Sequence, residues 1–367
     1  MALTDIEAGR LADNVFNVVG ANKNLIINGA MQVAQRGTSQ AGIISTLYSV
    51  CDRFKTVVSG LGTWTVSQDT SAPSGFSNSF KLTCTTADAS PAAGDLILVR
   101  YSVEAQDLQS LGFGTSDAKS TTMSFWVRSN KTGNASFTIH QRDNSNKQVS
   151  FQYSISSADT WEHKTIAIPA DTSGVINDDN GEGFEINWSL NSGTNYSSGS
   201  HQSTWGTYSD ANVNPSNLGV GGATSDYFQI TGVQLEVGSV ATPFEHRSFG
   251  DELLRCQRYF QKSYEYNTAP GTNTDNGKIY NYGSSDGASN IVSQIAPTVA
   301  FRTSPTITWY TPAGTAGKWN SARSGSQSDV TMNSYQSGEK RISGYCALGA
   351  AWTTGYAQGH YIAAAEF

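Results

Sequence analysis

Residues 79–84, SFKLTC, and residues 135–141, ASFTIHQ, alternate apolar and polar side chains with a period of two. In an extended strand, a period of two places every second side chain on the same face. Each stretch therefore predicts a β-strand with one buried face and one polar face. Strands of this kind bury their apolar faces by stacking in two sheets.

Similar segments, rich in β-branched and aromatic residues and separated by Gly, Asn, Asp or Pro, continue in both directions from these two stretches. No long helical pattern separates them, which excludes a parallel arrangement of alternating strands and helices. We predict a mainly β fold, an antiparallel jelly-roll-like β-sandwich. The predicted strands are 24–34, 48–58, 62–69, 79–86, 95–104, 121–129, 134–142, 147–155, 161–168, 183–190 and 226–237.

Two helices are predicted outside this series of strands. Thr4 and Glu7 have the spacing of a capping box, and the apolar stripe that follows predicts an amphipathic helix over residues 5–19. A helix of this length is marginal in water when isolated, so it needs a surface on which to dock. The segment from Ser248 to Tyr264 is predicted as a second helix, with acidic residues near its N-terminus.

The chain divides into four parts on this pattern. Residues 1–22 form an N-terminal helix or attachment arm, 23–245 the sandwich, 246–264 a connecting helix and 265–367 a second, small C-terminal β domain. Within the sandwich, residues 191–225 form a long Gly/Ser/Asn tract, and loops of this length are often functional. The predicted strands of the C-terminal domain are 277–282, 290–301, 306–310, 328–335, 340–348 and 359–367.

The composition excludes several classes of partner. Of the 367 residues only 14% are charged, 36 are Gly and the net charge is −7. Because the 23 Lys and Arg residues are spread along the chain, we expect no nucleic-acid partner. Apolar stretches are strand-sized, so we expect no membrane insertion. The N-terminus has acidic residues where a secretory signal is basic, which indicates synthesis and folding in a cytoplasm.

Catalytic chemistry has little support in the sequence. The chain has five histidines, and nothing in the sequence singles out one of them as the base of a nucleophile. The densest acidic cluster, Asp178, Asp179, Glu182 and Glu185, lies in residues 177–185, NDDNGEGFE, where Asn, Asp and Gly at successive positions predict a tight turn. A bound hard cation and a glycosidase carboxylate pair are the two alternatives for this segment. We predict no enzyme, no cofactor and no metal.

Cys51, Cys84, Cys256 and Cys346 are far apart in the sequence, with no C-x-x-C pair. We predict that all four are reduced and buried as small apolar side chains.

Binding of a carbohydrate has more support than catalysis. A sugar has an apolar C–H face and a rim of hydroxyls, so its site needs an exposed aromatic ring beside polar side chains. The 191–225 tract and the C-terminal domain both supply aromatic residues among Asn, Ser and Gln. The candidate ligand-binding residues are Tyr196, Trp205, Tyr208, Trp319, Trp352 and Tyr356. Tryptophans inside strand patterns are assigned to core or sheet packing: Trp64, Trp126, Trp161 and Trp188.

Several blocks of the sequence resemble virion proteins of tailed bacteriophages, of the tail-fibre type with a jelly-roll body and a small C-terminal β domain. The blocks are NLIINGAMQVAQRGTS (24–39), FGTSDAKSTTMSFWVRSNKTG (113–133), TWEHKTIAIPAD (160–171), ITGVQLEVGSVATPFEHRSFGDELLRCQRYF (230–260), FRTSPT (301–306) and GHYIAAAEF (359–367).

The resemblance implies a non-enzymatic structural or adhesive protein of the virion, assembled in the host cytoplasm as a homotrimer. On this basis we expect a short tail fibre that binds other virion proteins through its N-terminal helix and a host-surface glycan multivalently. The alternative is a purely architectural role, as a capsid-decoration, head-fibre or tail-collar protein.

Overall fold

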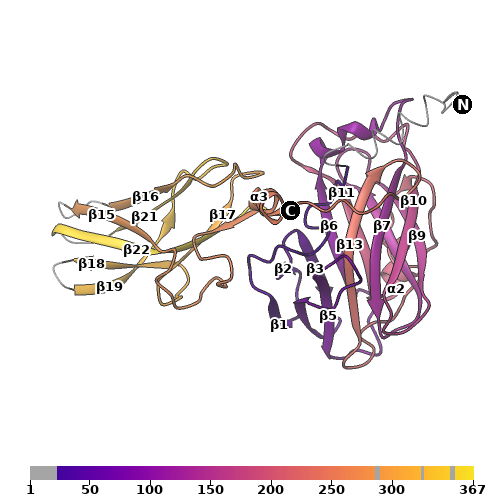
Figure 1. Cartoon of the computed structure of the whole chain (residues 1–367), viewed down its shortest axis with the longest axis horizontal. Helices are drawn as coiled ribbons and strands as arrows, with labels where there is room; N and C mark the ends of the chain where they lie inside the picture. Colours follow the sequence, from indigo (N-terminus) through magenta and orange to yellow (C-terminus); the bar gives the residue numbers. More distant parts are fainter. Residues whose placement is uncertain (1–22, 286–289, 324–325, 348–351) are drawn as a thin grey trace, which may run out of the picture.

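Two β modules follow one another along the long axis of the molecule, each with its own hydrophobic core (Figure 1). The computed structural model describes residues 23–285, 290–323, 326–347 and 352–367. The helix predicted over residues 5–19 therefore lies outside the described residues. Helix α3 (Phe249–Gln257) joins the two modules.

The first module is a sandwich of two antiparallel sheets, so the predicted mainly β, antiparallel fold is confirmed. The six-stranded sheet runs in the order β1 (Ser39–Ile43), β4 (Thr63–Asp69), β5 (Ser79–Thr86), β13 (Tyr227–Val237), β7 (Thr121–Ser129) and β10 (Glu162–Ile168). The seven-stranded sheet runs in the order β12 (Gly206–Thr207), β9 (Lys147–Ile155), β8 (Gly133–Gln141), β11 (Glu182–Ser192), β6 (Leu96–Glu104), β3 (Phe54–Ser59) and β2 (Leu47–Tyr48).

The period-two stretches form strands β5 and β8, with their apolar faces in the core. Phe80 on β5 and Phe137 on β8 are both fully buried between the sheets. Trp188 of β11 fills the space beside Phe137, with ring centroids 5.6 Å apart. Burying large aromatic side chains in this way is the main source of stability in such a sandwich.

The polar face of β8 is also buried, unlike the solvated face that alternation predicts. Thr138 and His140 are 0% and 4% exposed. The 191–225 tract crosses this face, and the ring of Tyr208 stacks on His140 with centroids 3.9 Å apart. The tract contains the short helices α2 (Thr194–Ser197) and η2 (Asp210–Asn212) as well as β12. It therefore forms a cover on the sandwich.

The second module packs a larger sheet against a three-stranded one. In the larger sheet β22 (Trp352–Ala364) is central, and it pairs with β14 (Phe260–Lys262), β15 (Ile279–Ser285), β17 (Thr306–Tyr310) and β18 (Lys318–Arg323), which pairs in turn with β19 (Ser326–Thr331). The three-stranded sheet consists of β16 (Asn290–Ile295), β21 (Ile342–Ala347) and β20 (Asn333–Ser334). The core between them includes the perpendicular pair Trp309 and Trp319, whose ring centroids are 5.4 Å apart.

Several predicted elements differ from the structure in their bounds, and two differ more strongly. The strand predicted at 24–34 is a series of turns, because Asn28 and Met31 adopt left-handed backbone conformations with φ of 62° and 56°. The helix predicted over 248–264 begins at its predicted cap, Ser248, whose side chain accepts a hydrogen bond from the Asp251 amide. It ends at Gln257, since the next residues leave the helix to form β14 and pair with β22.

All four cysteines are buried. The 3₁₀ helix η1 (Ala105–Leu111) follows β6. No helix in the described part of the chain has both the length and the apolar character needed to span a membrane.

Glu104, at the end of β6, anchors the connecting helix to the sandwich. The carboxylate is fully buried and accepts hydrogen bonds from Nε and Nη2 of Arg258, each at 2.7 Å. It also accepts a hydrogen bond from the hydroxyl of Tyr259. A bidentate pair of this kind fixes orientation as well as distance, so the start of the second module is held firmly against the first.

This anchor predicts acid sensitivity. Burial alone would raise the pKa of Glu104, but the hydrogen bonds from Arg258 and Tyr259 outweigh it and hold the pKa below its ordinary value of 4.5. A lowered carboxyl pKa contributes stability that is complete above the unfolded-state pKa and is lost as pH falls through the folded-state pKa. We expect the free energy of unfolding to fall more steeply from about pH 5 to about pH 3 in the wild type than in Glu104→Gln. Denaturant titrations at each pH measure this, and parallel curves would contradict it.

Candidate functional site

Three tyrosines lie together on the outer face of the larger sheet of the second module. Tyr280 and Tyr282 alternate with inward-facing residues on β15, and Tyr282 lies directly opposite Tyr356 of the neighbouring β22. These strands extend away from the sandwich (Figure 1). Side chains two apart on one strand and directly opposite on the next share a face of the sheet.

The three rings form one exposed surface. Tyr282 is 79% exposed and Tyr280 is 43% exposed, whereas Tyr356 between the strands is half-buried. The rings of Tyr280 and Tyr282 are nearly parallel, at 10°, with centroids 6.1 Å apart. Tyr356 contacts both, with centroid distances of 5.6 and 6.1 Å. Exposed aromatic rings grouped in this way are unusual on a protein surface unless they bind something.

Polar side chains continue the same face across β18 and β19. In register with Tyr280 lie Gln358, Asn320 and Asp329, one from each successive strand. Their amide and carboxylate groups are joined at 3.4 Å, from Gln358 Nε2 to Asn320 Oδ1 and from Asn320 Nδ2 to Asp329 Oδ1. We call the whole surface the tyrosine face, comprising Tyr280, Tyr282, Asn320, Gln327, Asp329, Tyr356 and Gln358.

Tyr356 connects the aromatic and polar halves of the tyrosine face. Its hydroxyl accepts a hydrogen bond of 3.4 Å from Nε2 of Gln327 on β19. The residue between these two strands, opposite Tyr356 on β18, is the small Ala322. Because Ala322 has only a methyl side chain, no larger group stands between the ring of Tyr356 and the amide of Gln327.

The structure places the three candidate residues of the C-terminal domain differently. Tyr356 lies on the tyrosine face. Trp319 is fully buried on the opposite side of the same sheet, where its indole N–H donates to the carbonyl of His360 at 3.0 Å. It supports the sheet and offers no ring to a ligand. Trp352 begins β22.

The three candidates in the 191–225 tract are packed onto the sandwich. Tyr196 and Tyr208 cover the small apolar cluster of Leu96, Leu98 and Val213 on the outer side of the seven-stranded sheet. Trp205 is stacked against Phe184 with centroids 5.7 Å apart, and its indole N–H donates to the carbonyl of Pro169 at 2.7 Å. All three are half-buried, and they hold the tract in place.

Tyr280 and Tyr282 are absent from the candidates, although the sequence carries a signal for them. The stretch IYNYG, 279–283, alternates tyrosine with other residues at a period of two. That period places both rings on one face of any strand formed there. Their exposure follows only from the position of β15 in the sheet.

The acidic segment 177–185 contains a bend over residues 178–181 and then enters β11 at Glu182. Asp179 accepts a hydrogen bond from the amide of Gly181 at 2.7 Å, which is the local contact expected of a tight turn. Glu182 and Glu185 both pair with Arg142, at 3.3 Å each. Among the described residues, no group of three or more His, Cys, Asp or Glu side chains is placed to hold a metal ion.

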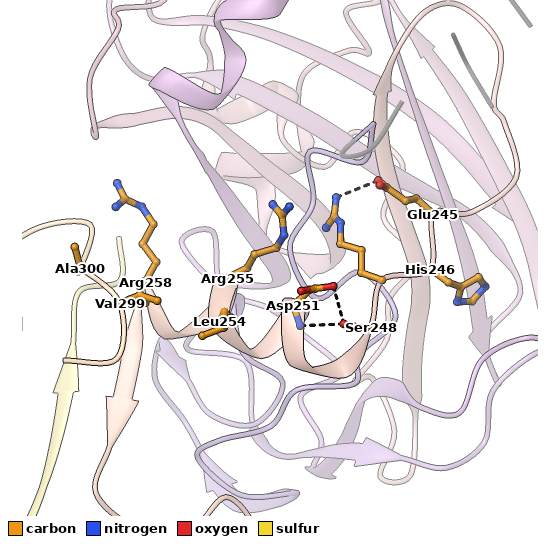
Figure 2. A pocket seen from close by; sticks show the side chains of 10 residues that line it. Glu245, His246, Ser248, Asp251, Leu254, Arg255, Arg258, Val299 and Ala300 are labelled. Carbon is orange, nitrogen blue, oxygen red and sulfur yellow. Dashed lines mark hydrogen bonds and ion pairs between the residues drawn. The ribbon is translucent and has the colours of Figure 1, made fainter. Parts of the chain in front are cut away.

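A pocket of about 800 Å³ lies along α3, between the segment of Glu245 and His246 and the segment of Val299 and Ala300 (Figure 2). Its arginines have structural partners. Arg247 pairs with Glu245 at 3.1 Å and donates to the carbonyl of Ile26, and Arg258 is held by Glu104 as described above. These contacts stabilise the junction between the modules.

Comparison with known proteins gives only similarities of fold. No family model and no curated protein matches the chain. The enzymatically active domain of tailspike protein 4 of bacteriophage CBA120 is 14% identical with a TM-score of 0.29, and the match covers 59% of this chain and 22% of that one. The CBM22-1 xylan-binding domain from Paenibacillus barcinonensis is 10% identical with a TM-score of 0.29, covering 60% and 98%. A family 11 carbohydrate-binding module of a Clostridium thermocellum cellulase is 13% identical with a TM-score of 0.28, covering 57% and 98%. Similarities of this size assign no function to this chain.

Proposed function

We propose that the second module binds a glycan on its tyrosine face and performs no catalysis. The observation that carries the proposal is the group of exposed rings of Tyr280, Tyr282 and Tyr356 beside a row of amide and carboxylate side chains. An aromatic ring offers its face to the apolar C–H face of a sugar, and the energy comes from buried apolar area plus the interaction of C–H groups with the ring.

The polar half of the tyrosine face suits the hydroxyl groups of the same sugar chain. Asn320 and Gln327 each offer both a donor and an acceptor, and Asp329 offers an acceptor. Gln327 and Asp329 are exposed, so these groups exchange water for ligand hydroxyls at little cost. A single sugar usually binds in a concave pocket that buries most of its surface. A flat face of this kind therefore fits an extended chain of several sugars better than one sugar ring.

We further propose that the protein is an adhesion protein of a bacteriophage virion. The sequence blocks that resemble tail-fibre proteins support this proposal, and so does a binding face on strands that extend away from the sandwich (Figure 1). In a homotrimer, three copies of the face would engage a cell surface together, and multivalency of this type raises retention far above the affinity of one site.

Tyr282→Ala tests the glycan-binding proposal most directly. Loss of this ring, which is 79% exposed and therefore contributes little to folding, is expected to weaken glycan binding about tenfold, equivalent to about 1.4 kcal/mol. The measurement is binding of the purified full-length chain to an array of bacterial surface glycans, followed by calorimetry with the best ligand.

Tyr335→Ala is the matched control, since Tyr335 is 47% exposed and lies outside the tyrosine face. Its affinity should equal that of the wild type. If the wild type binds no glycan on the array and does not adsorb to bacterial cells, glycan binding is wrong and the architectural alternative is favoured. If it clears a polysaccharide layer, the absence of catalysis is wrong.

A further inference from the structure

The outer face of the six-stranded sheet contains a second pocket. This pocket belongs to the first module, whereas the tyrosine face belongs to the second. The pocket has a volume of about 630 Å³, within the range of small-molecule sites. Trp126 of β7 and His163 of β10 stand on the sheet, directly opposite each other across the two strands. Phe76, Phe244 and His246 come from two loops that fold over the same face.

Aromatic rings form two walls of this pocket. On the sheet, the rings of Trp126 and His163 are 5.1 Å apart. On the loops, Phe76, Phe244 and His246 contact one another, with centroid distances of 4.9 to 5.3 Å. Each of the five rings is at least partly exposed. Trp126 packs on the outer face of the sheet, in agreement with the sheet packing predicted from the sequence, and part of its ring is exposed.

Gly232 allows the two walls to converge. It lies in an irregularity of the pairing between β13 and β7, with a positive φ of 60°. A Cβ atom at this position would come within 2.7 Å of the Phe76 ring and 2.9 Å of Cδ1 of Trp126. Because Gly232 has no side chain, the rings of Phe76 and Trp126 can both lie close to its backbone. The two rings together form the base of the pocket.

The other residues that line the pocket carry hydroxyl groups or are small and apolar. Ser74 and Ser124 contribute hydroxyl groups, and none of the lining residues in the described part of the chain is Asp, Glu, Lys or Arg. The hydroxyl of Thr242 is already engaged, because it donates to Glu236 and accepts from Lys23.

Burial lowers the pKa of His163 below its ordinary value, so this imidazole is uncharged near neutral pH. Aromatic faces with neutral hydrogen-bonding groups suit a neutral sugar. The ammonium of Lys23 touches the lining, but it is already bonded to the hydroxyl of Thr242 and the carbonyl of Pro243, which leaves it less free to pair with an acidic sugar.

We propose that the pocket of Trp126, Phe76 and Gly232 is a second carbohydrate site, specific for one neutral sugar ring. The ring of the sugar stacks on the face of Trp126 with Phe76 beside it, and its hydroxyl groups bond to the side chains of Ser74, Ser124 and His163. The site belongs to the sandwich and does not depend on the tyrosine face of the second module. One chain thereby offers a pocket for a single sugar ring and a flat site for an extended glycan segment.

The test follows Trp126 itself in the full-length chain. Labelling with 5-fluorotryptophan gives one ¹⁹F signal for each of the eight tryptophans, and the signal missing from Trp126→Phe belongs to Trp126. The probes are methyl glycosides of glucose, galactose, mannose, rhamnose, N-acetylglucosamine and N-acetylgalactosamine, with methyl glucuronide as the charged comparison. We expect at least one neutral glycoside to shift the Trp126 signal with a Kd of about 1 mM, and the glucuronide to leave it in place.

Two variants identify the site. Phe76→Ala is expected to raise that Kd about tenfold. Phe249→Ala, which removes a 45% exposed ring of α3 outside the pocket, should leave the Kd unchanged. The combined variant Tyr282→Ala/Tyr356→Ala should also bind normally here, so failure of the tyrosine face and failure of this pocket are separate results. The proposal is overturned if no neutral glycoside shifts the Trp126 signal, if Phe76→Ala binds as the wild type does, or if the glucuronide binds equally well.

Discussion

Glu366→Ala is expected to separate the unfolding of the two modules. The side chain of Glu366, next to the last residue in the sequence, reaches the sandwich and accepts hydrogen bonds from Arg53 at 2.5 Å and Arg36 at 3.1 Å. Arg53 is only 1% exposed, and its guanidinium lies 3.4 Å from the ring centroid of Tyr259. Removing the carboxylate leaves the charge of Arg53 buried without its counter-ion, which costs about 3–5 kcal/mol.

The interaction lost in Glu366→Ala lies at the contact between the two modules. The hydrophobic core of each module stays intact. Calorimetry of Glu366→Ala should show two transitions, with the second module unfolding first. Glu339→Ala, which removes an exposed carboxylate from the same module, is the control and should unfold as the wild type does. Arg53→Met/Glu366→Leu should recover part of the loss, because an apolar pair of similar size replaces a buried ion pair at little cost. A single transition at the wild-type temperature in Glu366→Ala would refute this account of the junction.

The acidic turn takes part in the same junction. Asn180 Nδ2 donates to the carbonyl of Arg302 at 2.6 Å, and Nη1 of Arg302 donates to the carbonyl of Asn180 at 2.7 Å. The composition of residues 177–185 predicts a turn, and the structure has one. Its role in joining the modules depends on a residue more than a hundred positions away, so no local pattern could have indicated it.

Period-two alternation predicts the strands whose burial is decided locally. β5 and β9 have the predicted bounds, 79–86 and 147–155. The prediction is wrong where distant contacts decide. At 24–34 the chain has the apolar residues of a strand, but the side chain of Asn28 bonds to the backbone of Val33 and Asp52 and holds a turn instead. β18 was not predicted, because KWNSAR is polar and pairs with β22 only once the sheet exists.

In the candidate site, too, the sequence pattern indicates the residue types, whereas distant contacts decide which side chains are exposed. Residue type alone cannot separate Trp319, fully buried, from Tyr356, half-buried on the tyrosine face. The two residues lie on opposite faces of one sheet, and their strands pair at Ala322 and Tyr356. The face that is buried depends on which side the three-stranded sheet covers. Only the arrangement of the two sheets fixes that choice.

Tyr282→Ala/Tyr356→Ala should abolish measurable glycan binding by the second module. Tyr356 contacts both Tyr280 and Tyr282, so its removal with Tyr282 leaves Tyr280 as a single, unsupported ring. Each lost ring removes about 1–2 kcal/mol of apolar burial and stacking. Together they lower the affinity of one site about 100-fold. Because multivalent retention multiplies the affinities of several sites, adsorption of the assembled protein to cells should fall still more steeply.

The double variant must be shown to fold before its binding is interpreted. Its melting temperature should lie close to that of the wild type, because Ala357, Trp319 and the remaining core on the opposite side of the sheet are untouched. Tyr282→Phe/Tyr356→Phe is the matched comparison. It keeps both rings and removes only the two hydroxyl groups, one of which accepts the hydrogen bond from Gln327. If stacking carries the affinity, this pair of substitutions should weaken binding less than tenfold. Equal loss in both variants would assign the affinity to the hydroxyl groups, and unchanged binding in the alanine variant would move the glycan site away from the tyrosine face.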